Sequence, residues 1–187
     1  MKIIKELLPG AFLLQSNRLE DERGHFVKTF NLDVFESLGL PTDWCEEYYS
    51  ISRKGVVRGM HFQSPPNEHS KMVYCLKGRV LDVILDIRKN YPTYGKYAYL
   101  EISAETSQVL IVPPGLAHGF CALTDEATLH YKVSSVYAKE DDDGILWNSF
   151  GFNWPIEDPI ISKRDSRFPA LIDFESKFTN SLYSNEL

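Results

Sequence analysis

Several features that mark whole classes of protein are scarce or absent in this sequence. The three cysteines, Cys45, Cys75 and Cys121, are odd in number, widely spaced and form no Cys-x-x-Cys pair. Such a pattern does not predict a disulfide framework, so we expect buried, reduced thiols and a cytoplasmic location. No apolar run approaches the ~20 residues of a membrane span, and the N-terminal segment lacks the apolar core of a signal peptide. No membrane partner is therefore expected.

Basic residues are also fewer than acidic ones. The 187 residues contain 20 Lys and Arg against 26 Asp and Glu, a net charge of −6. Proteins that grip a nucleic-acid backbone usually show the opposite balance, so no nucleic-acid partner is expected. A glycine-rich phosphate loop is missing too. Any phosphate of a small ligand would be held by side chains, for which Arg23, Arg58, Lys71 and Arg164 are the candidates.

What the sequence does contain is a succession of short segments rich in β-branched and aromatic residues, separated by turn residues. Strands are predicted over residues 12–18, 25–30, 48–52, 71–76, 80–87, 97–102, 109–112, 117–123 and 128–134. One short helix is predicted over Asp33–Leu38, where Gly39 ends it. The pattern predicts an all-β sandwich or barrel and excludes alternating βαβ units.

The chain is long enough for one domain with its own core, which we expect to span residues 1–187. The barrel core is expected over about residues 10–137. From about residue 140 an acidic turn and several aromatic residues interrupted by prolines predict an irregular tail with short helical turns, packed on the barrel through residue 187.

Two predicted strands alternate in a way that leaves their orientation open. In residues 80–88 an apolar row opposes a row that contains Asp82, Asp86 and Arg88. In residues 127–133 an apolar row that includes Tyr131 opposes His130 and its polar neighbours. A polar face normally turns to water, but in a barrel that holds a ligand it can line the cavity instead.

Two of the five histidines stand out as candidate proton carriers. His61 and His118 lie in glycine-flanked strands, where a ligand can approach the backbone closely. Histidines could instead hold a metal, but His61 and His69 are eight residues apart across a Ser-Pro-Pro turn and need not share a strand. No metal is expected. A nucleophilic hydrolase is not expected either, because the sequence has no Gly-x-Ser-x-Gly elbow.

At these residues the sequence resembles the dTDP-4-dehydrorhamnose 3,5-epimerase family, the RmlC-like cupins. The matching segments occur in the same order over roughly residues 1–170 and are 21–26 (DERGHF), 54–63 (KGVVRGMHFQ), 71–73 (KMV), 78–88 (GRVLDVILDIR), 91–95 (YPTYG), 113–120 (PPGLAHGF), 131–132 (YK), 147–148 (WN), 154–155 (WP) and 161–165 (ISKRD). The resemblance implies a cupin-type β-jelly-roll barrel, a homodimer, and epimerisation without a metal or organic cofactor in deoxysugar biosynthesis.

The resemblance also implies roles for individual residues. His61 would be the general base, paired with Asp165, and Tyr131 the acid that returns a proton to the opposite face. Lys71 and His118 would surround the sugar and its ketone oxygen. Arg58 and Arg23 would contact the diphosphate of the nucleotide sugar, Tyr137 would stack near the base, and Arg164 would be a further substrate contact.

Some positions depart from the family pattern. Glu46-Glu47-Tyr48 stands where Gln-Asp-Asn is typical, Lys28 where an acidic residue is usual, and Asp142 about where a glutamate is common. Because these positions mostly serve the nucleotide, we count Lys28, Glu46, Tyr48 and Asp142 as substrate-binding candidates. The hypothesis is that the chemistry is kept and that the nucleotide or the sugar is changed.

The main interpretation is therefore an enzyme that inverts C3 and C5 of a nucleotide-linked 4-keto-6-deoxyhexose through an enolate. Two alternatives stay open. One is a single-centre epimerase or a ketoisomerase that acts on a CDP-, GDP- or dTDP-linked 4-keto sugar. The other is a non-catalytic cupin that binds a sugar or a metal.

Overall fold

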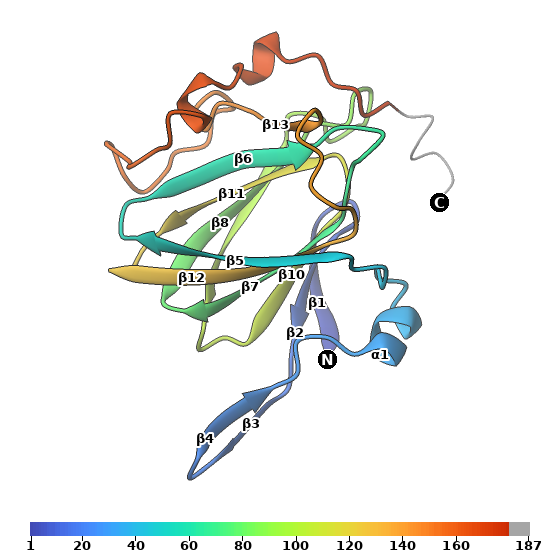
Figure 1. Ribbon diagram of the computed structural model, residues 1–187, viewed down its shortest axis with the longest axis vertical. Coiled ribbons are helices and arrows are strands. Elements are labelled where there is room, and N and C mark those ends of the chain that lie inside the picture. The colour runs from blue at the N-terminus through green and yellow to red at the C-terminus, as the bar shows by residue number, and fades with distance from the viewer. Residues whose placement is uncertain (180–187) are drawn as a thin grey trace.

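The computed structural model describes residues 1–179, which form two antiparallel β-sheets packed face to face (Figure 1). The six-stranded sheet has the order β1-β2-β10-β7-β12-β5. Its strands are β1 (Lys2–Leu8), β2 (Ala11–Gln15), β10 (Gln108–Val112), β7 (Lys71–Lys77), β12 (Glu126–Val133) and β5 (Glu46–Arg53).

The five-stranded sheet has the order β13-β6-β11-β8-β9. Its strands are β13 (Asp142–Gly144), β6 (Val57–Gln63), β11 (Leu116–Ala122), β8 (Arg79–Asp86) and β9 (Tyr97–Ser103). From β5 onward the chain passes to the other sheet at every step between consecutive strands except β8 to β9. These crossings give the predicted all-β jelly roll, which is confirmed.

Three shorter regular elements complete the fold. The hairpin of β3 (Arg18–Asp21) and β4 (Gly24–Val27) projects away from both sheets (Figure 1). Helix α1 (Leu32–Ser37) begins at the cap Asn31, whose side chain accepts a hydrogen bond from the Val34 N–H, close to the predicted helix over 33–38. Two 3₁₀ turns, Asp165–Arg167 and Leu171–Asp173, lie in the C-terminal segment, as predicted for the tail. Residues 180–187 of the expected tail lie outside the described residues.

The sheets extend further along the sequence than expected. Strand β1 pairs with β2 before the expected core start at residue 10, and β13 pairs with β6 beyond residue 137. Neither of these strands, nor β3, was predicted, because Lys2–Leu8, Arg18–Asp21 and Asp142–Gly144 are rich in charged residues and lack a clear β-forming run. Pairing with a neighbouring strand decides their conformation.

Strand β8 shows why the alternation could not be assigned from sequence, because both of its faces are buried. Val80 and Ile84 pack between the two sheets, together with the buried Asp82. Val83 and Leu85 pack on the opposite face, beneath the aromatic residues of the C-terminal segment. The polar row therefore turns toward the barrel interior, and the C-terminal segment covers the apolar row (Figure 1).

Candidate active site

A cavity of about 360 Å³ lies in the barrel. Its wall includes most of the predicted site residues: Glu46, Tyr48, Arg58, His61, Lys71, His118, Tyr131, Tyr137, Asp142 and Arg164. They come from β5, β6, β7, β11, β12, β13 and the segments that follow, so segments far apart in the sequence meet here. The fold thus brings together ten of the thirteen predicted residues in the wall of one cavity.

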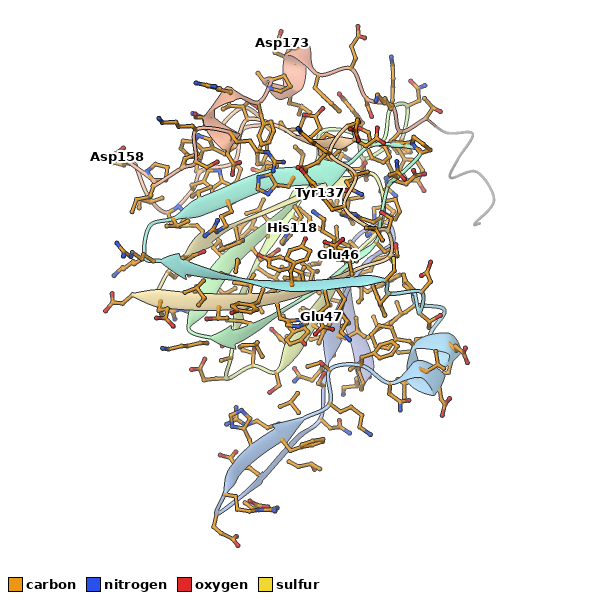
Figure 2. The ribbon with its side chains drawn as sticks, in the orientation of Figure 1. Glu46, Glu47, His118, Tyr137, Asp158 and Asp173 are labelled. Carbon is orange, nitrogen blue, oxygen red and sulfur yellow. The ribbon has the colours of Figure 1, made fainter. Side chains whose placement is uncertain are left out.

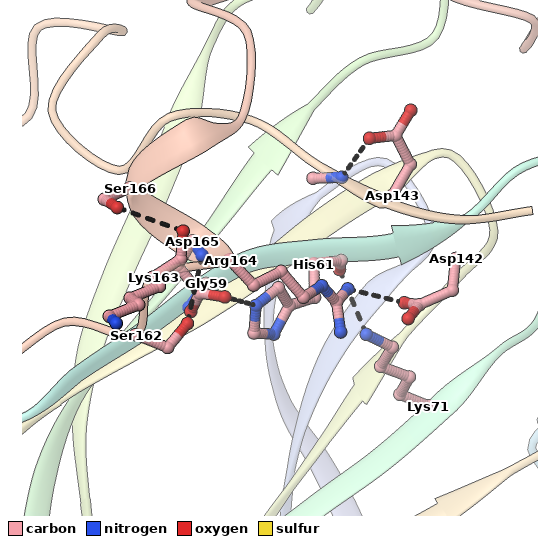
Figure 3. A network of polar contacts seen from close by, with 11 residues as sticks. Gly59, His61, Lys71, Asp142, Asp143, Ser162, Lys163, Arg164, Asp165 and Ser166 are labelled. Carbon is pink, nitrogen blue, oxygen red and sulfur yellow. Dashed lines mark hydrogen bonds and ion pairs between the residues drawn. The ribbon is translucent and has the colours of Figure 1, made fainter. Parts of the chain in front are cut away.

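Asp165, the predicted partner of His61, lies behind the imidazole. Its Oδ1 is 3.0 Å from His61 Nε2, and its Oδ2 accepts a hydrogen bond from the Gly59 N–H at 3.2 Å (Figure 3). Ser162 Oγ accepts a hydrogen bond from the Asp165 backbone N–H, which fixes the turn. The carboxylate is therefore held by the strand that carries His61 as well as by its own loop.

The environment keeps this histidine a free base and its partner an anion. Burial lowers the pKa of His61 below its ordinary value, more than Asp165 raises it, and the nearby cations Lys71 and Arg164 add to the lowering. Burial acts to raise the pKa of Asp165, but its hydrogen bond and charge interaction with His61 and the Gly59 N–H hold it below the ordinary value. A neutral imidazole can accept a proton, and the carboxylate stabilises the cation that results.

Lys71 supplies a buried positive charge beside that base. Its side chain is 7% exposed, and its Nζ donates a hydrogen bond to the His61 backbone oxygen at 3.0 Å (Figure 3). Burial lowers the pKa of Lys71 to about 8. A desolvated ammonium group interacts strongly with a developing oxyanion, because little water screens it.

His118 is held next to His61 by strand pairing. The two residues are direct register partners on β11 and β6, and a bulge separates this pair from the next one, Phe120 and Arg58. At the bulge Gly59 and Gly119 approach so closely that a Cβ on Gly119 would lie 2.8 Å from the Arg58 carbonyl oxygen. Glycine at this point lets the two strands carry both imidazoles into the same space.

The second histidine has its own buried carboxylate. His118 Nε2 lies 2.8 Å from Oδ2 of Asp82, and both side chains are buried. Asp82 was not among the predicted site residues, although its place in the polar row of residues 80–88 was a signal for it. The carboxylate fixes the orientation of the imidazole ring, as second-layer partners commonly do.

Tyr131 points into the cavity from the opposite sheet. Its side chain is only 6% exposed, its hydroxyl lies 3.2 Å from Ser50 Oγ, and its ring meets the His118 ring edge-on. Burial raises the pKa of Tyr131 well above its ordinary value, so the phenol keeps its proton. Tyr48 stacks on the same ring at 4.9 Å, and its own pKa is raised to about 12, chiefly by burial.

Four more of the predicted residues lie at the rim of the cavity. Arg164 donates to Asp142 at 2.8 Å, and the backbone N–H of Tyr137 donates to Glu46 Oε2 at 2.8 Å (Figure 3 for the first pair). The Tyr137 ring is 58% exposed. Its phenol has a raised pKa because the charge of Asp142 lies nearby. The opening of the cavity is therefore surrounded by the exposed Tyr137 ring, the ion pair of Arg164 and Asp142, and the Glu46 carboxylate.

Two predicted residues lie elsewhere. Arg23 is at the tip of the β3–β4 hairpin, where its guanidinium forms a bidentate pair with Asp21 in full contact with solvent. Lys28 directly follows β4 and is exposed. Neither residue lines the cavity of its own chain, because the hairpin projects away from both sheets (Figure 1).

Seven further residues of the wall were missed from the sequence: Ser50, Phe62, Gln63, His69, Phe120, Val133 and Ser135. For most of them the sequence contains no sign of a functional role except that a predicted site residue lies nearby along the chain. His69 was considered only as a metal ligand, and burial lowers its pKa to about 3, so it is a neutral polar group. Within residues 1–179 no group of three or more His, Cys, Asp or Glu side chains is placed to hold a metal ion.

The cysteines are reduced, as predicted, but not all of them are buried. Cys45, Cys75 and Cys121 are all free, and Cys75 and Cys121 are buried. Cys45 is exposed, contrary to the prediction, because it lies in the segment that leads into the edge strand β5. No helix in the described part of the chain is long and apolar enough to cross a membrane.

Comparison with known proteins gives one consistent result. The sequence profile described as dTDP-4-dehydrorhamnose 3,5-epimerase matches residues 5–173. The enzyme of that name from Shigella flexneri is 40% identical over 176 residues, which cover 92% of this chain and 97% of that one. A dTDP-4-dehydrorhamnose 3-epimerase from Streptomyces niveus is 34% identical and shares 84% of this chain and 78% of its own.

The same likeness holds in three dimensions. The crystal structure of dTDP-6-deoxy-D-glucose-3,5-epimerase from Legionella pneumophila, in complex with dTDP-4-keto-L-rhamnose, superposes with a TM-score of 0.88 at 30% identity. The match covers 93% of this chain and 94% of that one.

Proposed function

Because the chain belongs to the dTDP-4-dehydrorhamnose 3,5-epimerase family, we propose that it inverts C3 and C5 of a nucleotide-linked 4-keto-6-deoxyhexose. The observation that carries the proposal is that His61 and Tyr131 line the same cavity from opposite sheets. Inversion at a carbon requires a base on one face and a proton donor on the other, and this pair supplies both. The nucleotide-sugar substrate is also supported by the complex of the Legionella relative.

In the proposed reaction His61 takes the proton from the carbon next to the ketone. The C–H electron pair forms a carbon–carbon double bond, and the carbonyl electrons move onto oxygen to give an enolate. Lys71 and His118 stabilise that oxyanion, an effect worth about 3–4 kcal/mol for each well-placed donor. The enolate electrons then re-form the ketone as Tyr131 delivers its proton to the other face of the carbon. His61 releases the abstracted proton to solvent, and the phenolate is reprotonated from solvent. Repetition at the second carbon completes the double inversion.

Asp165 has a supporting part in this proposal. It holds the His61 ring and stabilises the imidazolium that forms when the carbon proton is taken. Arg58 and Arg164 are the guanidinium groups of the cavity wall, and we assign the diphosphate to them. Tyr137 at the rim is assigned to stack on the base of the nucleotide.

We further propose that the protein is a homodimer. Leu19 and Phe26 are 66% and 61% exposed on the projecting hairpin, and Tyr49 and Ile51 are exposed on the outer face of the edge strand β5. Exposed apolar groups of this size on a projecting hairpin and a sheet edge favour association. Arg23 and Lys28 lie on or beside this hairpin, so in a dimer they would contact substrate in the partner's cavity and not in their own.

Residues 1–187 are proposed to form one domain that works in the cytoplasm. Three free cysteines suit a reducing compartment, because no pair of them forms a disulfide. The reaction itself would belong to deoxysugar biosynthesis, as in the relatives that share its family.

The test is deuterium incorporation from D₂O into nucleotide-linked 4-keto-6-deoxyglucose, followed by NMR. Incorporation of two deuterons, at C3 and at C5, with inversion at both carbons is expected. A single site of incorporation would support the one-centre alternative, which the similarity to the Streptomyces niveus 3-epimerase also favours. Binding without any incorporation would show that the protein is not an epimerase.

A further inference from the structure

Glu46 is a carboxylate in the cavity wall without a cationic partner. It is the first residue of β5, and within residues 1–179 no Lys, Arg or His side chain forms an ion pair with it. The other carboxylate of the wall, Asp142, is neutralised by Arg164. The neighbouring Glu47 points to the opposite face of the strand and pairs with His130 and Lys132 (Figure 2).

The carboxylate of Glu46 is nevertheless held in place. Its Oε2 accepts the backbone N–H of Tyr137 at 2.8 Å, which joins it to the exposed ring at the rim (Figure 2). Each carboxylate oxygen can accept two hydrogen bonds. Oε1 and one lone pair of Oε2 therefore stay available for donors from a ligand, in an orientation that the Tyr137 backbone fixes.

The position of Glu46 along β5 relates it to the base of the substrate. Ser50, beside the Tyr131 hydroxyl, is four residues further along this strand, which corresponds to about 13 Å at a rise of ~3.3 Å per residue. A diphosphate and a pentose can span that separation. When the sugar lies between His61 and Tyr131, the nucleobase of the substrate thus reaches the rim. There the Tyr137 ring can stack on the base and the Glu46 carboxylate can accept hydrogen bonds from its edge.

The pairing edges of the common bases differ in how they suit a carboxylate that only accepts hydrogen bonds. Guanine presents two adjacent donors, N1–H and N2–H₂, which match the two oxygens of one carboxylate. Thymine and uracil present a single N–H between two carbonyl oxygens, and these oxygens repel the carboxylate. Cytosine and adenine present one amino donor beside a ring nitrogen lone pair. Bidentate pairing with a charged acceptor is strong and selective.

We propose that Glu46 makes this cavity select a guanine nucleotide, so that the substrate is a GDP-linked 4-keto-6-deoxyhexose. This inference rests on the proposed function for the identity of the sugar, but its selection of the base depends only on Glu46 and Tyr137. A glutamine at the same position would offer one donor and one acceptor, which suits thymine. Glu46 is thus the residue that would separate this chain from relatives named for dTDP-linked substrates.

The experiment is calorimetric titration of the full chain with GDP, dTDP and CDP. The wild-type protein is expected to bind GDP at least about tenfold more tightly than dTDP or CDP, as one bidentate charged pair allows. In Glu46→Gln the preference for GDP over dTDP is expected to fall by at least about tenfold. Glu47→Gln is the matched control, because it removes the adjacent charge from the outer face and should keep the preference.

Wild-type protein that binds dTDP or CDP as tightly as GDP would overturn the inference. An unchanged preference in Glu46→Gln, with an unchanged melting temperature, would overturn it as well. The deuterium assay with GDP- and dTDP-linked 4-keto sugars separates this inference from the proposed function. Incorporation with the dTDP sugar alone would overturn the selection of guanine by Glu46 and support the epimerase activity. A preference for GDP without incorporation into any sugar would support the selection of guanine and overturn the epimerase activity.

Discussion

His118 Nε2 and Asp82 Oδ2 meet 2.8 Å apart, with side chains only 4% and 0% exposed. The residues lie on the neighbouring strands β11 and β8, and both are buried. The same pair of chemical groups occurs at the surface, where His130 Nε2 lies 3.2 Å from Glu47 Oε1 and the glutamate is exposed. The two pairs provide an internal comparison of what a His–carboxylate contact contributes at different depths.

Removal of the buried carboxylate is expected to destabilise the protein much more than removal of the exposed one. Asp82→Ala leaves the buried His118 nitrogen without a partner, which should lower the free energy of unfolding by about 1–3 kcal/mol. Glu47→Ala should lower it by less than about 1 kcal/mol, because water replaces the lost partner. Urea unfolding followed by fluorescence measures both, and equal losses would contradict the structural reasoning.

Substitution of Asp165 should impair the chemistry while leaving substrate binding nearly intact. In Asp165→Asn the imidazolium of His61 loses its charged partner, so kcat is expected to fall by about tenfold to hundredfold or more, with little change in KM. Asp158→Asn, an exposed position on the loop far from the cavity, should behave as wild type (Figure 2). Steady-state kinetics of epimerisation measure kcat and KM for both variants. A change confined to KM in Asp165→Asn would contradict the prediction and assign Asp165 to substrate binding.

The plot of kcat/KM against pH should be bell-shaped. Protonation of His61 removes the base, so kcat/KM should fall as pH drops through the pKa of His61, which lies below its ordinary value of 6.5. Deprotonation of Lys71 removes the cation that faces the oxyanion, so kcat/KM should also fall as pH rises through about 8. The raised pKa of Tyr131 lies beyond this range and adds no further limb below it.

The alkaline limb can be attributed by mutation. Lys71→Met should be much less active and should lose the fall near pH 8, whereas the acid limb stays. The measurement is initial rate of deuterium incorporation from pH 5 to 9.5. An alkaline limb that persists in Lys71→Met would show that another group titrates there.

Removal of the Tyr131 hydroxyl should separate proton removal from inversion. In Tyr131→Phe the base His61 remains, so exchange of the substrate proton should continue more readily than formation of the inverted product, which is expected to fall by about 10²-fold or more. Tyr99→Phe removes a hydroxyl from an exposed ring on the edge strand β9, outside the cavity wall, and should have no effect. NMR of the products in D₂O reports exchange and inversion together, and an equal loss of both would argue against Tyr131 as the returning acid.

The sequence by itself determined the class of the fold and most of the site. Short β-branched and aromatic runs with turn residues between them predict an all-β structure, and comparison with the family pattern identified ten of the residues that line the cavity. Local chemistry was enough to place helix α1 to within one residue at each end, because Gly39 stops the predicted helical run. These features depend on neighbours along the chain or on contiguous motifs, so they can be seen without coordinates.

Only the tertiary structure decided which face of each strand meets the cavity. Strand β8 is buried on both faces, so its alternation could not show that Asp82 turns inward to His118. Tyr131 lies on an apolar row that looks like ordinary core, and its place in the cavity wall depends on the opposite sheet. The projecting hairpin likewise moved Arg23 away from the cavity. Side-chain direction depends on what packs against a strand, and that is set by segments distant in sequence.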